Sequence, residues 1–381
     1  MVMTMMRSFN SQFLFLLALF FLLFSSCSFA AKEADKQGGW KSINADYYSY
    51  ITTATNTQSG TDNSAAAGIF RLFGNYVLGD SQNDYGKVVF KVEHRDSYTT
   101  TSPKYFVLNN VGAIGLIEPQ FNDQGFRLTN LYWQKQWNNN NIEVLAGFLD
   151  TTDYVDTYML GNPWSGFANF IFSTGAGSLA IPDEATLGIA LRNMFTSNLY
   201  GLGSLTDANA SSSEPFDGLF QGSELFSSLE LGWVESLDSF YTRNLHLTYW
   251  RLDGGTRHSI EDSSGYNFSF IYKVDDWIPF IRAGYAEGDA SLLSSSITMG
   301  LGYLGVGDGS DSINFAMGWG QPNKALFGAQ FDDQYTTELF YKTSIGKHVT
   351  LSPNIQYLKT LPLSSDYDDS WVFGLRMHLK I

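Results

Sequence analysis

Trp371-Val-Phe-Gly-Leu-Arg-Met-His-Leu-Lys-Ile381, the C-terminal stretch of the chain, decides the fold class. Large apolar side chains occupy every second position, and valine, glycine or basic side chains occupy the positions between them. Side chains of a strand alternate between its two faces, so this pattern predicts a strand with one apolar and one polar face. About ten such residues are typical of a strand that crosses an outer membrane. Barrels of this kind characteristically finish on such a strand, usually with an aromatic residue where this chain has Ile381.

The same alternation recurs along the chain. The segments that show it are 69–78, 87–95, 127–137, 142–149, 185–195, 198–206, 224–234, 243–251, 264–273, 277–286, 297–303, 313–319, 335–344 and 349–357. With the C-terminal stretch they make fifteen candidate strands, and Tyr105 to Ile117 is a weaker sixteenth. Because bacterial single-chain barrels have an even strand number, we predict an all-β fold, a transmembrane antiparallel β-barrel of 16 strands. A barrel of that size leaves an aqueous channel inside.

The N-terminus has the features of an export signal. Arg7 is followed by an apolar run from Phe13 to Phe24, and Ser28-Phe29-Ala30 places small residues at the two cleavage positions. A lipid anchor on Cys27 is the alternative, although Phe24-Ser25-Ser26 matches a lipidation signal poorly. Cys27 is the only cysteine, so cleavage after Ala30 leaves a chain without disulfides.

These features divide the chain into three parts. We predict a signal peptide at 1–30, a polar N-terminal extension or plug at 31–63, and the transmembrane barrel at 64–381. The mature part has no apolar run of the ~20 residues that a spanning helix needs, and only helices and closed barrels satisfy the backbone in lipid. The predicted location is therefore the outer membrane of a Gram-negative bacterium, with the lipid bilayer as one partner. An aromatic content of 16% suits interfacial girdles, and the formal charge of −15 disfavours nucleic acid as a partner.

Residues suited to catalysis are sparse. The five histidines form no HxxxH pair, and no cysteine of the mature chain could help to hold zinc. His246 is the one plausible base on a strand, in the lumen phase between Leu245 and Leu247, and no nucleophile motif accompanies it. We therefore predict no enzyme, no catalytic residue, no metal and no cofactor. An outer-membrane enzyme and a surface adhesin remain the alternatives from other functional classes.

Charged residues in the lumen phase are the candidates for a selective site. A charge at the centre of a strand is costly against lipid, so it is expected to face water in the channel. The candidates on strands are Lys91, Glu93, Arg95, Arg192, Glu230, Trp250 and Arg282. The long connection 150–184 adds Asp150, Asp153, Asp156 and Trp164, and it could fold into the barrel as a constriction or pack outside it. The same phase places Phe280 in the lumen and Ile281 against lipid, so a charge is expected to be tolerated at Phe280.

Several motifs together resemble a known family. They are Ala146-Gly-Phe-Leu-Asp-Thr-Thr-Asp-Tyr-Val-Asp156, Asn162-Pro-Trp-Ser-Gly-Phe-Ala-Asn169, Trp277-Ile-Pro-Phe-Ile-Arg-Ala-Gly-Tyr-Ala-Glu-Gly-Asp-Ala290, Glu338-Leu-Phe-Tyr341, Leu351-Ser-Pro-Asn-Ile-Gln-Tyr357 and Val372-Phe-Gly-Leu-Arg376. In this order and spacing they resemble the carbohydrate-selective porin (OprB-like) family, from about residue 140 to the C-terminus.

The resemblance implies a sixteen-stranded channel for sugar uptake, and no catalytic residue is carried over with it. We therefore expect passive, solute-selective diffusion of small hydrophilic molecules, with carbohydrates as the leading solutes. The net negative charge keeps a general or cation-preferring porin as the alternative. The barrel could act alone or as a homo-oligomer.

Overall fold

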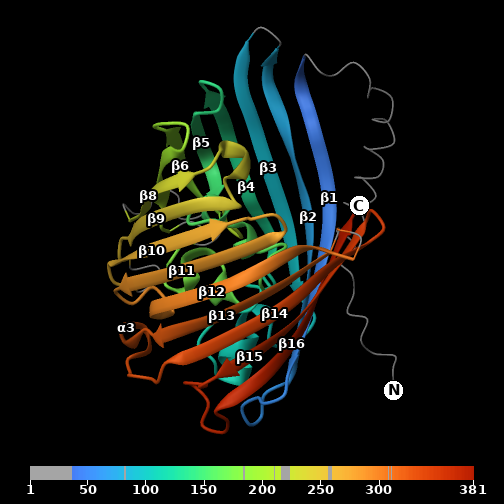
Figure 1. The fold of residues 1–381 in the computed structure, drawn as a ribbon, viewed down its shortest axis with the longest axis vertical. Helices are drawn as coiled ribbons and strands as arrows, with labels where there is room; N and C mark the ends of the chain where they lie inside the picture. Colours follow the sequence, from blue (N-terminus) through green and yellow to red (C-terminus); the bar gives the residue numbers. More distant parts are fainter. Residues whose placement is uncertain are drawn as a thin grey trace.

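The structure is a closed antiparallel barrel of sixteen strands, in which each strand pairs with its neighbours in the chain and β1 closes on β16 (Figure 1). This computed structural model describes residues 37–80, 83–182, 185–209, 211–215, 224–255, 260–307, 309 and 311–381. The predicted fold class is confirmed. The predicted signal peptide, with Cys27, lies outside the described residues.

The wall consists of strands of nine to eighteen residues. Their bounds are β1 Gln37–Ala54, β2 Ser64–Asp80, β3 Asp84–Ser97, β4 Gly125–Trp137, β5 Ile142–Asp150, β6 Ala185–Met194, β7 Leu199–Asp207, β8 Leu225–Val234, β9 Arg243–Leu252, β10 Ser263–Tyr272, β11 Trp277–Glu287, β12 Leu293–Val306, β13 Asp311–Pro322, β14 Gln334–Ile345, β15 Val349–Lys359 and β16 Asp369–Lys380. Short helical turns lie in the connections: α2 Pro103–Phe106, η1 Val107–Val111, η2 Thr151–Asp153, η3 Met159–Gly161, η4 Phe170–Phe172, η5 Thr174–Gly177, η6 Leu237–Ser239 and α3 Lys324–Phe327. No described helix is long and apolar enough to cross a membrane.

The sixteenth strand is not the one that the sequence predicted. Residues 31–63 were expected to form an extension or plug, but β1 lies within them and pairs with β16 from Asp46–Lys380 to Ala54–Val372. Residues 105–117 are instead the helical turns α2 and η1 and the segment after them, folded into the lumen. Their apolar side chains are buried there against the wall, which explains the apolar content that was read as a weak strand.

In the wall, many outward side chains are apolar and exposed, whereas many inward side chains are polar and buried. This is the reverse of the pattern in a soluble protein. In β16 the outward Trp371 is 45% exposed, whereas the inward Arg376 is 3% exposed. The same holds in β11, where Ile281 is 39% exposed and Arg282 is fully buried. The predicted faces of these strands are therefore correct.

The two ends of the barrel differ in the length of their connections. The end that holds the hairpin turns 138–141, 195–198 and 346–348 has short connections, whereas the opposite end carries the long connections 98–124 and 151–184. In outer-membrane barrels short turns face the periplasm and longer loops face outward. By this criterion both long loops enter the lumen from the external side.

These two loops form the core of the molecule inside the barrel. Phe106 and Phe121 of the first loop pack with Tyr50 of β1 in one apolar cluster. Phe167 of the second loop packs on Phe280 and Phe340, with ring centroids 5.8 and 4.9 Å apart. Much of the lumen is thus filled by protein.

The position of Phe280 changes one expectation from the sequence. Phe280 does face inward, but it is buried between Tyr158 and Phe167. A glutamate there would place a charge in an apolar cluster, so tolerance is no longer expected.

Ile281→Glu tests the lipid face of the same strand. The variant should lower the free energy of unfolding by about 2 kcal/mol or less, because a carboxylate would replace an apolar side chain that faces the bilayer. Urea unfolding in lipid vesicles measures this change. The matched control is Glu287→Gln, near the loop end of β11, which should have no measurable effect; equal effects of both variants would contradict the assigned faces.

Candidate functional site

The loop 151–184 is held inside the barrel by a buried ionic cluster on β9 and β11. Asp156, at the start of this loop, contacts His246 Nε2 at 2.8 Å through Oδ1 and accepts a hydrogen bond from the Arg282 guanidinium through Oδ2. Arg282 also donates to the carbonyl oxygens of Asp156 and Ser173. The Asp156 backbone, at φ 49°, donates to Glu230 of β8. One loop residue therefore connects three neighbouring regions of the wall.

The charge of Asp156 is stabilised in this cluster. Burial raises its pKa, but the Arg282 charge, His246 and the backbone amide of Gly175 outweigh burial, so that the net pKa lies below its ordinary value. Asp156 is therefore ionised in the folded protein at neutral pH, and it completes the ionic contacts of the cluster.

A second set of contacts fixes the middle of the loop to the opposite wall. Glu338 of β14 accepts the backbone amides of Ala168 and Asn169 at 2.7 and 2.8 Å. Arg376 of β16 donates to Gly166 O at 2.7 Å and to Glu118 of the loop 98–124 at 2.6 Å. Burial raises the pKa of Glu118, and the Arg376 charge only partly opposes this rise. The two loops and the wall are thus joined into one unit.

The unfilled part of the lumen lies along β1 to β4. Inward side chains of β8 to β16 that meet the loop, such as Asn267 and Arg282, are buried. Inward side chains of β2 to β4, such as Asn75, Lys87 and Tyr132, keep partial exposure. A solute that crosses the barrel would therefore pass between the loops and this side of the wall.

Six residues lie together beside this part of the lumen, and we call them the eyelet: Asp46, Arg71, Lys91, Asp150, Asp153 and Trp164. Arg71 of β2 pairs with Asp46 of β1 at 2.7 Å and lies over the Trp164 ring at 3.9 Å from its centroid. Lys91 of β3 pairs with Asp150 at 3.2 Å and lies 3.7 Å from Asp153. Each of the two cations is therefore matched by a carboxylate.

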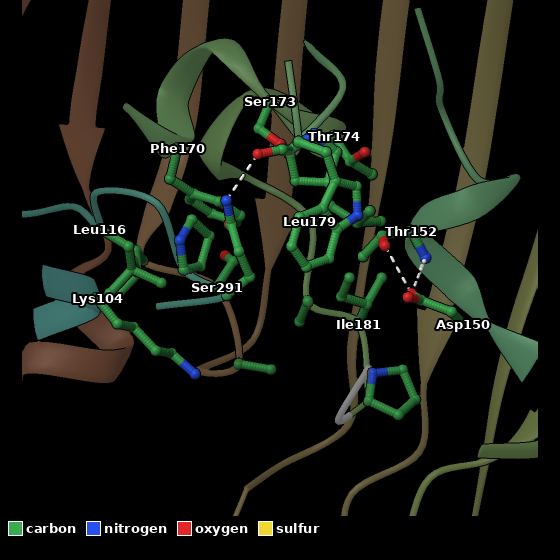
Figure 2. A pocket seen from close by; sticks show the side chains of 18 residues that line it. Lys104, Leu116, Asp150, Thr152, Phe170, Ser173, Thr174, Leu179, Ile181 and Ser291 are labelled. Carbon is green, nitrogen blue, oxygen red and sulfur yellow. Dashed lines mark hydrogen bonds between the residues drawn. The ribbon is translucent and has the colours of Figure 1, made fainter. Parts of the chain in front are cut away.

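A hollow lies on each side of the eyelet. The outer hollow, about 260 Å³, is bounded by the two long loops and by residues 290–292, and it includes Asp150 and Trp164 (Figure 2). The inner hollow, about 310 Å³, is bounded by β1 to β4 and includes Lys91 and Asp153. Asp150 lines the outer hollow and its partner Lys91 lines the inner hollow. The eyelet therefore lies between the two hollows.

Part of the chain matches a known family in sequence. Residues 261–381 match the model of the carbohydrate-selective porin, OprB family. This match covers the last third of the chain. The resemblance predicted from the motifs is thereby confirmed for this part of the chain. No curated protein sequence matches the chain.

Solved porin structures share the fold at low sequence identity. OprB of Pseudomonas putida at high pH is 14% identical, with a TM-score of 0.73 over 90% of this chain and 94% of that one. A loop-deletion mutant of OmpT from Vibrio cholerae is 14% identical, with a TM-score of 0.52 over 89% and 99%. A mutant of the Rh. blastica porin is 13% identical, with a TM-score of 0.54 over 89% and 99%. These likenesses establish the porin fold.

The structure brings only some of the candidate site residues together. Lys91, Asp150, Asp153 and Trp164 meet at the eyelet, next to the passage. Asp156, Glu230 and Arg282 belong to the buried anchor of the loop instead. The folded loop covers these three side chains, and their pore-lining role stays a prediction.

Four other candidates lie elsewhere in the lumen. Glu93 and Arg95 pair with each other at 2.6 Å and are both buried. Arg192 pairs with Glu143 of the adjacent strand β5 at 3.0 Å. Trp250 is fully buried in an apolar cluster with Tyr200 and Phe226. None of these four is part of the eyelet.

Two eyelet residues were missed from the sequence. Asp46 lay in the segment assigned to an extension, so its strand was not considered. Arg71 was recognised as part of a strand, but its inward neighbours Ile69 and Phe73 are apolar and concealed the polar face. An arginine inside an alternating strand was the available signal, because such a charge must face water.

His246 has a structural role in the anchor of the loop 151–184. It is buried, with Nδ1 2.7 Å from Asn244 Oδ1 and Nε2 2.8 Å from Asp156 Oδ1. Both ring nitrogens are thus engaged with oxygen acceptors in the loop anchor. The described residues also contain no group of three or more His, Cys, Asp or Glu side chains placed to hold a metal ion.

Proposed function

We propose that this chain is an outer-membrane porin for passive diffusion of small neutral hydrophilic solutes, carbohydrates foremost. The observation that carries the proposal is the eyelet, where paired charges and an indole ring narrow the passage. Planar polar groups can exchange hydrogen bonds with hydroxyls, and an aromatic face can contact the C–H face of a sugar ring. The family match of the C-terminal third supports the same solute class.

The paired charges favour a neutral solute over an ion. Arg71 with Asp46, and Lys91 with Asp150, place opposite charges side by side across the passage. A constriction selects ions through an excess of one sign, as rings of like charge do in channels. The eyelet also holds a third carboxylate, Asp153, 3.7 Å from Lys91, so its carboxylates exceed its cations by one. This excess and the overall charge of −15 support the alternative, a general or cation-preferring porin.

The barrel has the lipid bilayer as one partner, and a homo-oligomer is supported by its outer surface. Most outward side chains from β7 to β16 are large and apolar. β1 and β2 also expose large apolar side chains such as Ile51, but one row across β1 to β3, Ser49, Gly68 and Asp96, is polar or small. Polar and small residues are better placed against another protein surface than against lipid tails.

Trp164→Ala tests the role of the eyelet in solute binding. In planar bilayers, glucose should reduce the ion current of the wild-type porin, and the variant should bind glucose about ten-fold more weakly, because it loses the aromatic face. Ion selectivity should stay unchanged, because Trp164 carries no charge. The control is Trp137→Ala, an exposed tryptophan at the turn end of β4. A strong cation preference with no effect of sugar would contradict the proposal and establish the alternative.

A further inference from the structure

We infer that the outer hollow is a binding site for glycosides that carry an apolar or aromatic aglycone. The inference rests on the proposed function and specifies its solute class. Eighteen residues line the hollow, and most of them are apolar. Apart from Asp150 at the end of β5, they come from the loops 98–124 and 151–184 and from the connection 288–292, so three separate connections build one surface.

The hollow is amphipathic along its length. Figure 2 shows Asp150 and Thr152 together at one side, joined by hydrogen bonds from Thr152 N and Oγ1 to Asp150 Oδ1 at 3.1 and 2.6 Å. In this view Leu179 and Ile181 lie between that pair and Phe170. The polar side is also the side of the eyelet, because Asp150 pairs with Lys91 there. A solute would therefore place its polar half toward the eyelet and its apolar half among the aliphatic and aromatic side chains.

An unsubstituted sugar does not match the apolar part of this surface. Hydroxyls placed against Phe170, Leu179 or Ile181 would lose water without gaining a hydrogen-bond partner, which is unfavourable. A phenyl or alkyl group would instead be stabilised by the apolar area that it removes from water. The volume of about 260 Å³ is close to the lower limit of ordinary small-molecule pockets and suits one sugar ring with one small substituent.

Two polar groups at the hollow lack a partner among the described residues. Gln120 is 3% exposed and donates from Nε2 to Glu118 and to Pro163 O, and its Oε1 accepts no hydrogen bond in the part of the chain that the structure describes. The Lys104 ammonium also has no hydrogen bond there, and its contact is the Tyr105 ring, 5.1 Å away. Figure 2 shows the Lys104 side chain extended along the hollow. Lys104 thus offers a donor at the apolar side of the hollow, away from the Asp150–Thr152 pair, whereas the Gln120 Oε1 atom is itself buried.

The experiment compares phenyl β-glucoside with methyl β-glucoside on the full-length protein in planar bilayers. Both share the sugar, so the ratio of their binding constants, measured from the reduction of ion current, isolates the substituent. We expect phenyl β-glucoside to bind about ten-fold more tightly, as burial of part of a phenyl ring would give. Benzoate is the third probe, because Lys104 could instead favour an apolar anion.

Two variants and one control connect the preference to this hollow. Phe170→Ser and Ile181→Ser should each reduce the ratio to about two-fold or less, because both side chains are partly exposed within the hollow. Leu326→Ser, an exposed leucine of α3 outside the hollow, should preserve the ten-fold ratio. Heat-modifiable migration in gels confirms that each variant has folded. If one of the two serine variants does not fold, the other still tests the hollow.

Three results would overturn the inference. These are equal binding of the two glucosides to the wild type, a preference that survives in both serine variants, and tighter binding of benzoate than of phenyl β-glucoside. In each case methyl β-glucoside or glucose would still reduce the current if the proposed function is correct. If no sugar had any effect on the current, the proposed function would fail together with this inference.

Discussion

Deletion of residues 371–381 is expected to abolish membrane-integrated barrel. β16 pairs along its whole length with β15 and from Asp46 to Ala54 with β1, so its loss opens the sheet and leaves two unpaired edges. Each backbone group left without a partner in lipid is unfavourable by several kcal/mol, and the cost is repeated along both edges. Heat-modifiable migration and resistance to added protease measure the amount of inserted barrel, and both should fall to background.

The control for this deletion keeps the strand and changes only its last residue. Ile381→Phe should insert as well as the wild type, because Ile381 is 70% exposed, and the pairing of its backbone amide with Ala45 O is retained. Efficient insertion of the deleted chain would contradict the closed barrel. Loss of insertion in Ile381→Phe would show that the end of the chain, and not strand pairing, controls the result.

Arg282→Glu is expected to release the loop 151–184 from the wall, with a several-fold rise in single-channel conductance. Arg282 is fully buried and holds Asp156 and the carbonyl of Ser173, and the substitution would place a new carboxylate beside Asp156. Disruption of a buried ion pair from one side costs about 3–5 kcal/mol. The sequence alone placed Arg282 in the lumen as a candidate for a selective site, and its buried contacts in the structure add an expected loss of stability.

Conductance in planar bilayers and urea unfolding in vesicles measure the two effects. The matched control is Arg251→Glu on β9, two strands from β11, where the arginine is half exposed and pairs with Asp253 and Asp262. Solvent and salt screen exposed pairs such as these, so this control should keep the wild-type conductance. Wild-type conductance and stability in Arg282→Glu would show that the loop does not depend on this anchor. A shift in ion selectivity without a change in conductance or stability would show that Arg282 lines the pore.

The same anchor predicts how the loop responds to acid. Because the pKa of Asp156 in the folded protein lies below its unfolded value of 3.8, its stabilising contribution is fully present above about pH 4. The contribution is lost as the pH falls below 3.8 toward the folded pKa. At pH 5 the wild type should therefore keep the conductance of the anchored loop. Arg282→Glu should already show the higher conductance of the released loop at this pH.

Local alternation determined most of the wall. Fifteen strands could be predicted because a strand that separates lipid from a wet or packed lumen must place apolar side chains at every second position. β1 escaped prediction because its inward face carries Tyr48 and Tyr50, which pack on the loops, while its outward face includes Ser49 and Thr53. Its two faces are similar in polarity, so the pattern that reveals a strand is missing.

The sequence by itself determined the barrel, the faces of its strands and the lumen position of residues such as Lys91 and Arg282, because these follow from the period of the side chains along one strand. Only the tertiary structure decided which of them the loops cover. Asp156 reaches His246 and Arg282 across 90 and 126 residues of chain, and Glu118 reaches Arg376 across 258. Contacts at such separations depend on the path of two loops through the lumen, which alternation along a strand does not record. Those loops bury Arg282 and leave Arg71, Lys91 and Trp164 beside the passage.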